Sequence, residues 1–229
     1  KSLRGETVRE PRGWEPMGAA LLDYHRGARD GVLFITHDLG GRDELPISYF
    51  FRNPDEMNSV ERAALSLTRG RVLDLGAGVG SHALALQSLG HEVVAMDSLP
   101  EAVEIMTDRG VSDARVGSWS ELSVGGTFDT ILLMMNGAGL AGSIEGMARL
   151  LVTLEKILSP GGQILIDSVN LPEVLEAPRD ADGIPYGEDG RYPGELQYQL
   201  EYAGRRADPI PLLFLDFDLL SGLCADRSL

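Results

Sequence analysis

The segment RVLDLGAGVGSHALAL, residues 71–86, contains a short apolar strand, three closely spaced glycines and the start of an apolar helix. Gly76, Gly78 and Gly80 stand at alternate positions directly after the strand pattern. Glycine in such a turn lets the backbone come close to a neighbour, because it has no side chain and accepts positive φ angles. The neighbour is a dinucleotide, another nucleotide-like cofactor, or only the helix that follows.

Two acidic residues and one serine narrow this choice. The dinucleotide fingerprint G-x-G-x-x-G requires a glycine where Ser81 stands. Asp74 places a carboxylate at the end of the strand, which disfavours a pyrophosphate and suits a cofactor with a positive group. The next predicted strand, EVVAMD, ends at Asp97, where a carboxylate can accept hydrogen bonds from both hydroxyls of a ribose. The pattern disfavours a nicotinamide dehydrogenase and favours another nucleotide-like cofactor.

From residue 71 onward, strand patterns alternate with helix patterns, which predicts βαβ units and a parallel sheet. The helix predicted at 143–158 has the clearest apolar stripe, and the SPGG sequence ends it. We therefore predict an α/β fold with a Rossmann-like, mostly parallel sheet flanked by helices. The predicted strands cover 71–75, 92–96, 114–116, 128–135 and 163–168, and the predicted helices cover 80–89, 100–109 and 143–158.

The segments outside this pattern look like additions to the sheet. We expect residues 1–54 to form an N-terminal helical lid or cap and residues 55–229 to form the main domain. Residues 172–195 are rich in proline, glycine and acidic residues, which predicts an irregular, lid-like connection. Alternation of polar and apolar residues in 195–204 predicts a C-terminal antiparallel strand, the sixth of the sheet.

Four blocks resemble the class I S-adenosylmethionine-dependent methyltransferases: VLDLGAGVG, then VVAMD with PEAVEIM, then FDTILLMMNG, then LSPGGQILI. Their order and spacing make the resemblance specific, and it implies S-adenosylmethionine as the cofactor and S-adenosylhomocysteine as the product. The family sheet has seven strands. Because the sequence stops after the predicted sixth, we expect the seventh to be missing and expect that a homo-oligomer could cover the open edge.

The resemblance also implies individual roles. Asp74 is expected near the cofactor's amino group and Asp97 on its ribose, while Ser118 stands where the family commonly has an acidic residue facing adenine. Arg52 is expected to pair with the methionyl carboxylate, or else to be solvated, and Trp119 either meets adenine or is a partly buried surface indole. The residues expected against the cofactor are Tyr49, Arg52, Asp74, Gly76, Ala77, Gly78, Gly80, His82, Asp97, Ser98, Leu99, Ser118, Trp119 and Met135.

The reacting centre is expected where the fourth predicted strand ends, because open α/β sheets bind ligands outside the carboxyl ends of their strands. Asn136 lies at that point, and we predict that its amide orients the acceptor or the methionyl end of the cofactor; the alternative is that it caps the turn before Gly137. Methyl transfer depends mainly on alignment, so no catalytic base is required. A proton-accepting role is open to His25 or His37.

Composition excludes several classes of partner. The formal net charge of −15 disfavours a nucleic acid, and no apolar run is long enough to span a membrane. Cys224 is the only cysteine, which fits a reducing, cytoplasmic compartment, and no Cys/His cluster has metal-ligand spacing, so we expect no metal.

These observations lead to one function and two alternatives. We expect S-adenosylmethionine-dependent methyl transfer to a nitrogen or oxygen of a small-molecule acceptor. A protein methyltransferase is less expected, because the sequence has no long insertion that could form a groove for a polypeptide. The second alternative is a non-catalytic module with the methyltransferase fold, which cofactor binding would distinguish.

Overall fold

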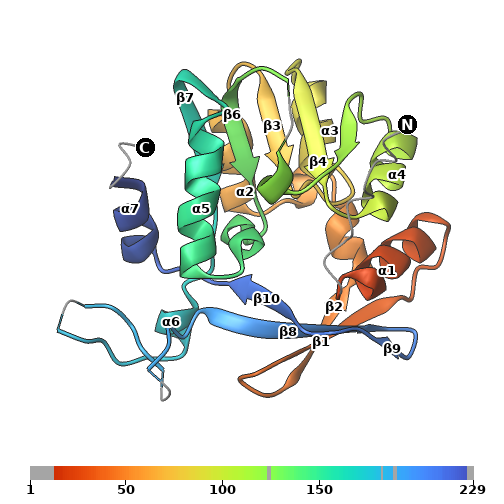
Figure 1. Ribbon diagram of the computed structural model, residues 1–229. Coiled ribbons are helices and arrows are strands. Elements are labelled where there is room, and N and C mark those ends of the chain that lie inside the picture. The colour runs from red at the N-terminus through yellow and green to blue at the C-terminus, as the bar shows by residue number, and fades with distance from the viewer. Residues whose placement is uncertain (1–12, 123–124, 182, 188–189, 226–229) are drawn as a thin grey trace, which may run out of the picture.

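Two sheets lie one above the other in the computed structural model, which describes residues 13–122, 125–181, 183–187 and 190–225 (Figure 1). The upper layer is a parallel sheet with helices on both faces, and the lower layer is an antiparallel sheet facing one end of the parallel strands. Residues 1–12, 123–124, 182, 188–189 and 226–229 lie outside the described part of the chain, and they include the start of the predicted N-terminal cap and part of the predicted irregular connection.

The parallel sheet has the order β5-β4-β3-β6-β7, and every neighbouring pair in it is parallel. The predicted α/β fold class is therefore confirmed. The chain moves outward from β3 through β4 to β5 and then returns to the other side of β3, so the strand order reverses between β3 and β6. Its strands are β3 (Val72–Leu75), β4 (Val93–Asp97), β5 (Ala114–Val116), β6 (Phe128–Leu133) and β7 (Leu158–Ile166).

Alternation along β3 decides what each side chain meets. Leu73 and Leu75 belong to the apolar cluster under α5, whereas Val72 packs on the opposite face with α2 and α3. Asp74 shares the face of Val72, so its carboxylate points towards α2 and α3. The helices that cover the two faces are α2 (Ser59–Leu67), α3 (Ser81–Ser88), α4 (Pro100–Arg109) and α5 (Ile144–Glu155).

Two boundaries differ from those predicted near SPGG. The predicted helix 143–158 ends at Glu155, and the strand predicted at 163–168 begins earlier, at Leu158. Leu158 pairs with Phe128, and the register then shifts so that Gln163 pairs with Thr130. The proline and glycines are thus accommodated as an irregularity inside the edge strand, where proline is tolerated.

The predicted sixth strand exists, but its place in the fold was predicted wrongly. Residues Glu195–Tyr202 form β8, which pairs with β1 and β10 in the second sheet and not with the parallel strands. Leu200 and Tyr202 pack with Leu33 of β1 against α1 and α4. The second sheet has the order β10-β8-β1-β2 with β9 added to β8; the other strands are β1 (Val32–His37), β2 (Arg42–Pro46), β9 (Arg205–Arg206) and β10 (Ile210–Leu213).

The N-terminal segment contains more than the helix expected there. Helix α1 (Glu15–His25) lies between α4 and the antiparallel sheet, and buries Met17, Ala20 and Leu21. The β1–β2 hairpin follows and supplies two strands of the second sheet, so that sheet crosses the predicted boundary at residue 54. Two short 3-10 helices, η1 (Ile47–Phe51) and η2 (Pro54–Glu56), then lead into α2.

The remaining elements join the two layers. The predicted irregular connection begins with the short α6 (Leu171–Val174), and the described part of the chain ends with α7 (Phe217–Ala225) beside α5 (Figure 1). Leu219, Leu220 and Leu223 of α7 pack on the apolar cluster that includes Ile164 of β7. Two 3-10 turns, η3 (Trp119–Glu121) and η4 (Gly137–Ala141), lie after β5 and β6. In the described part of the chain, no helix has the length and apolarity needed to cross a membrane.

Candidate functional site

The glycine loop joins β3 to α3 and has one open position. All three glycines adopt positive φ angles, +75° at Gly76, +55° at Gly78 and +80° at Gly80. A Cβ at Gly80 would stand 2.8 Å from Val111, and one at Gly76 would stand 2.9 Å from Leu140. A Cβ at Gly78 would have no atom within 4 Å. The first and last glycines thus serve the fold, while Gly78 leaves space into which a ligand can come close.

Asp97 ties this loop to the end of β4. Its Oδ2 accepts a 2.8 Å hydrogen bond from the N–H of Gly78, and its Oδ1 accepts a 2.9 Å bond from the N–H of Leu99. Burial raises the pKa of the Asp97 carboxyl, and these backbone bonds oppose the rise. A carboxylate can accept about four hydrogen bonds, so positions remain for a ligand beside the loop.

Asp74 carries a buried oxygen that lacks a partner. The residue is 2% exposed, and its Oδ2 is among three buried side-chain oxygen or nitrogen atoms without a hydrogen bond in the described residues. Burial raises the pKa of Asp74 to about 6, with His82 opposing the rise and the negative charge of Asp97 adding to it. An unpaired buried carboxylate oxygen is costly, so this position favours the arrival of a hydrogen-bond donor.

A buried ion network lies behind Asp74. Arg52 makes a two-pronged contact with Glu61 of α2, with nitrogen–oxygen distances of 2.7 and 2.9 Å. His82, in the first turn of α3, donates to the same carboxylate at 3.0 Å. The guanidinium of Arg52 also lies 3.8 Å from the ring centre of Tyr49. Arg52 is therefore not solvated, which was one of the two sequence-based alternatives, because Glu61 holds it; its pairing with the methionyl carboxylate stays a prediction.

Sequence reasoning missed Glu61. The spacing of Asn58 and Glu61 is that of a capping box, and the structure contains that box, with Glu61 accepting from the Asn58 N–H. A capping pattern predicts an exposed acidic residue at a helix start, whereas Glu61 is fully buried. Glu61 can be buried because Arg52 and His82 contact its carboxylate, and the sequence around Glu61 does not predict these contacts.

On the side predicted for adenine, the polar groups are engaged locally. The hydroxyl of Ser118 caps η3 by accepting from the Ser120 N–H, and the indole N–H of Trp119 donates to the carbonyl of Leu140 at 2.9 Å. Leu140 was not predicted, yet its side chain lies against Gly76. Ser98 and Leu99 follow Asp97 directly, as expected from the sequence, and Leu99 is buried.

The end of β6 has an unusual backbone. Met135 and Asn136 both adopt the left-handed conformation, with φ angles of 64° and 62°. The carboxylate of Asp167, at the end of β7, accepts from the N–H groups of Met135 and Gly137. Consecutive left-handed residues other than glycine are costly and concentrate at functional sites, so the turn requires such a clamp. Sequence reasoning did not single out Asp167.

Asn136 connects the two sheets. Its side-chain N–H donates to the carbonyl of Leu213 in β10 at 3.1 Å, and its amide oxygen accepts from the Ser168 hydroxyl at 3.3 Å. Both polar atoms of the amide are therefore engaged within the protein. The reacting-centre role expected for Asn136 stays a prediction. Its contacts with Leu213 and Ser168 agree equally well with a role in holding the turn after β6 against β10.

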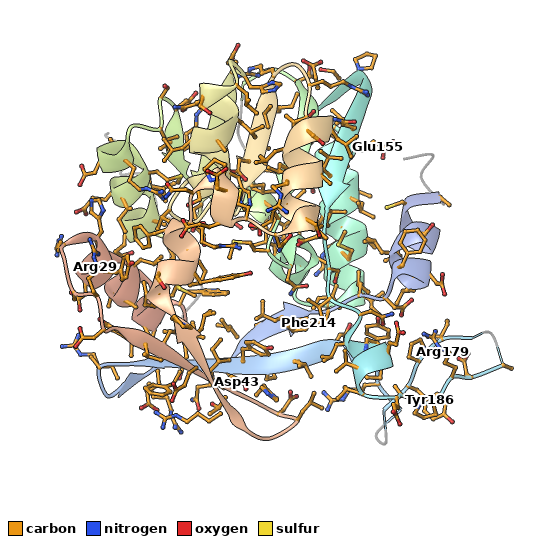
Figure 2. All side chains as sticks on the ribbon, turned by 180° about the vertical axis from the view of Figure 1, so that it is seen from behind. Arg29, Asp43, Glu155, Arg179, Tyr186 and Phe214 are labelled. Carbon is orange, nitrogen blue, oxygen red and sulfur yellow. The ribbon has the colours of Figure 1, made fainter. Side chains whose placement is uncertain are left out.

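A row of aromatic rings extends from this junction across the second sheet. The ring centres of Phe214 and Tyr198 are 5.6 Å apart, and those of Tyr198 and His37 are 5.8 Å apart. Nε2 of His37 lies 3.3 Å from a carboxylate oxygen of Asp43. Figure 2 labels Phe214 where the two layers meet and Asp43 farther out on the hairpin. His25 lies elsewhere, beside Asp108 on the α1–α4 surface.

Comparison with known proteins decides the family. A sequence model described as a methyltransferase domain matches residues 51–200, about two thirds of the chain. The chain belongs to the methyltransferase-domain family. The glycine loop, Asp97 and the turn after β6 all lie at the carboxyl ends of the parallel strands, which face the second sheet. This is the edge at which open α/β sheets bind their ligands.

A solved structure agrees with this chain over nearly the whole length of the chain. It is a SAM-dependent methyltransferase from Bacteroides fragilis in complex with S-adenosyl-L-homocysteine, 37% identical, with a TM-score of 0.81, covering 95% of this chain and 87% of that one. A structure of the CcbJ methyltransferase from Streptomyces caelestis, 16% identical over 75% of this chain and 82% of that one with a TM-score of 0.58, shares the fold.

Curated relatives match over a shorter stretch. Cypemycin N-terminal methyltransferase from Streptomyces sp is 33% identical over 119 residues, which cover 50% of this chain and 48% of that protein. Ubiquinone biosynthesis O-methyltransferase from Xanthomonas oryzae pv. oryzae is 29% identical over 125 residues, 52% of this chain and 50% of that protein. The chain thus spans about half the length of the curated relatives it matches.

Proposed function

We propose that this methyltransferase transfers a methyl group from S-adenosylmethionine to a nitrogen or oxygen of a small-molecule acceptor. The observation that carries the proposal is the open position at Gly78, whose N–H donates to the partly exposed carboxylate of Asp97. The unpartnered buried oxygen of Asp74, at the end of the strand that leads into the loop, supports it. The related Bacteroides fragilis enzyme was solved with S-adenosyl-L-homocysteine, which supports the same ligand here.

The residues present fit such a cofactor. Its ammonium group is a donor of the kind that Asp74 Oδ2 lacks, and its ribose hydroxyls are donors for the remaining acceptor positions of Asp97. The buried Asp74 carboxylate does not suit a pyrophosphate, which argues against a dinucleotide, whereas Asp97 would fit the ribose of either cofactor. We propose that Gly76, Ala77 and Gly78 line the cofactor, and that Ser98, Leu99, Ser118 and Trp119 surround its adenine.

When bound, S-adenosylmethionine supplies a methyl group activated by the positive sulfur. The protein's own contribution is alignment, which holds the acceptor atom in line and excludes water. We propose that the turn at Met135 and Asn136 provides this alignment, because the Asp167 carboxylate fixes its backbone and Asn136 fixes its distance from β10.

We place the acceptor between this turn and the second sheet. Tyr198 is on the same face of β8 as Leu200, and Leu200 packs against residues of α4 and the glycine loop. The row of Phe214, Tyr198 and His37 would therefore form one wall of the acceptor site. The wall is aromatic with a carboxylate, Asp43, at its outer end, which suits a small ring compound with a neutral or cationic group.

Ligand binding by the purified chain tests the proposal. S-adenosylhomocysteine at about 100 times its Kd should raise the free energy of unfolding by about 2.7 kcal/mol, seen as a higher melting temperature, whereas NAD should leave it unchanged. Release of S-adenosylhomocysteine should then identify acceptors in a panel of small amines, phenols and alcohols. Failure of the chain to bind either S-adenosylmethionine or S-adenosylhomocysteine would favour a non-catalytic module.

A further inference from the structure

Glu61 occupies an unusual position for a carboxylate near a ligand site. The residue has no exposed surface, and each of its two oxygens accepts from two donors. Oε1 accepts from Arg52 and His82, and Oε2 accepts from Arg52 and the N–H of Asn58. Burial would raise the pKa of Glu61, but these hydrogen bonds lower it to about 2. The side chain is thus ionised and held on all sides.

The two side chains that Glu61 holds come from different segments, one directly after η1 and one directly after the glycine loop. Arg52 follows η1, and its Nε donates to the carbonyl of Tyr49 while its guanidinium covers the Tyr49 ring. His82 belongs to the first turn after the loop. A second bond repeats this connection, because the hydroxyl of Ser81 donates to the carbonyl of Phe50 at 2.8 Å. One carboxylate therefore fixes the distance between η1 and the start of α3.

The same carboxylate acts on Asp74 through His82. Asp74 lies on the face of β3 that α2 and α3 cover, and the charges of His82 and Asp74 influence each other. Burial lowers the pKa of His82, yet its hydrogen bond to Glu61 and the charge of Asp74 outweigh this and raise the pKa. The imidazole is therefore protonated more readily than a free one, and its charge acts on Asp74, whose Oδ2 lacks a hydrogen-bond donor.

We propose that Glu61 is a positioning residue for the amino-acid end of the cofactor. It touches no ligand itself. It holds Arg52, which contacts Tyr49, and it holds His82, whose charge acts on Asp74. This arrangement would receive the ammonium and carboxylate groups. This inference rests on the proposed function and assigns a role to a residue that lies outside the glycine loop.

A purely stabilising role predicts a different pattern of effects. A buried ion pair often contributes little to stability, although breaking it by removing one partner is strongly destabilising. If Glu61 only supports the fold, its loss would lower the melting temperature and weaken every ligand of the site alike. If it positions the amino-acid subsite, the loss would depend on whether the ligand has an amino-acid group.

Two ligands separate these roles. S-adenosylhomocysteine contains the amino-acid group, whereas 5′-methylthioadenosine shares the adenosine and the thioether but lacks it. We would measure the Kd of both by titration calorimetry for the wild-type chain, Glu61→Gln and Glu61→Asp. In Glu61→Gln, the side-chain NH₂ group would face one of the N–H donors that now bind the carboxylate, and that donor would lose its acceptor. In Glu61→Asp, the shorter side chain cannot reach Arg52 and His82 together.

Asp216→Asn provides a matched control. Asp216 is also a buried carboxylate, 2% exposed, which accepts from the Tyr192 hydroxyl and the N–H of Leu219 at the start of α7. Its replacement should lower the melting temperature without changing either Kd. This variant shows how far loss of a buried carboxylate affects ligand binding through stability alone.

The expected result is that both Glu61 variants bind S-adenosylhomocysteine about tenfold or more weakly, with the Kd of 5′-methylthioadenosine changed by less than about twofold. Equal losses for the two ligands, or no loss, would overturn the positioning role. If Glu61→Gln does not fold, Glu61→Asp decides by the same criterion. A wild-type chain that binds neither ligand would overturn the proposed function and this inference with it.

Discussion

The N–H of Gly78 donates a 2.8 Å hydrogen bond to Oδ2 of Asp97, which joins the most open point of the glycine loop to the end of the neighbouring strand. The other oxygen of Asp97 accepts from Leu99 and so fixes the start of the segment proposed to meet adenine. One carboxylate thus shapes the loop on two sides, and its remaining acceptor positions face the ligand that the loop would bind. Fold and binding depend on the same group.

Replacement of Asp97 by alanine should weaken binding of S-adenosylhomocysteine by about 1–3 kcal/mol, because charged hydrogen bonds to the ribose are lost. This corresponds to a rise in Kd of roughly 5- to 150-fold by calorimetry. Asp113→Asn is the control, since Asp113 pairs with Arg115 away from the loop and should leave the Kd unchanged. An Asp97→Ala variant with wild-type affinity would refute the ribose assignment.

Gly78 and Gly80 should respond differently to alanine. At Gly80, where φ is also positive, a Cβ would meet Val111 and Met106 at 2.8 and 2.9 Å, so Gly80→Ala should destabilise the fold by about 2–5 kcal/mol in urea unfolding. At Gly78 the Cβ would enter open space, so Gly78→Ala should lose about 1–2 kcal/mol from its positive φ alone.

Binding should reverse this order. The methyl group of Gly78→Ala would occupy the space proposed for the cofactor, so its Kd for S-adenosylhomocysteine should rise about tenfold or more, beyond any change in folded Gly80→Ala. Equal affinities of the two folded variants would show that the open side of Gly78 is not the ligand side.

Much of the fold was predictable because periodicity reports which face of an element is buried. The strands of the parallel layer and helix 100–109 were predicted within a few residues for this reason. Alternation in β8 likewise showed a strand with one buried face. It did not show the neighbour of that strand, because β1 lies more than 150 residues earlier, and only the packing of Leu33, Leu200 and Tyr202 joins them.

The candidate site divides in the same way. Asp74, Asp97 and the glycines could be singled out because the role proposed for them depends on their position at strand ends, which sequence spacing reveals. Glu61 and Asp167 were not, because each acts through contacts with segments distant in sequence. Asn136 was placed correctly at the end of β6, but its bond to Leu213 spans 77 residues, and no local pattern predicts such a contact.

Binding of S-adenosylhomocysteine should weaken as the pH falls below about 6. Burial raises the pKa of Asp74 to about 6, so in the ligand-free protein this carboxyl takes up a proton near that pH and can no longer pair with an ammonium group. Below that pH the Kd should rise by up to about tenfold per unit. Calorimetry between pH 5 and pH 8 measures this, at values where the protein remains folded.

Asp74→Asn is the control for this titration, because its amide does not ionise and its Kd should depend less on pH.

The free energy of unfolding should change with pH in the opposite direction to the binding of S-adenosylhomocysteine. Since the folded pKa lies above the ordinary value of 3.8, protonation favours the folded state, and this contribution is lost as the pH rises from about 4 to about 6. Wild-type stability relative to Asp74→Asn should therefore fall by about 2–4 kcal/mol over that range. A flat Kd for the wild type would exclude an ionised Asp74 from the site.

Asn136→Asp should uncouple the two sheets. Aspartate keeps the shape and the tolerance for a left-handed backbone, and it still accepts from Ser168, but it places an oxygen against the carbonyl of Leu213 where an N–H now donates. We expect a loss of about 1–3 kcal/mol in urea unfolding, because two oxygens that both accept would then face each other in a partly buried position with no hydrogen between them. Asn53→Asp is the matched control, because Asn53 is an exposed cap of η2 and aspartate caps a helix equally well. The free energy of unfolding of this variant should differ from wild type by less than about 0.5 kcal/mol. If the two variants were equally stable, the contact between Asn136 and Leu213 would contribute nothing to joining the sheets, and the reacting-centre role would remain for the amide.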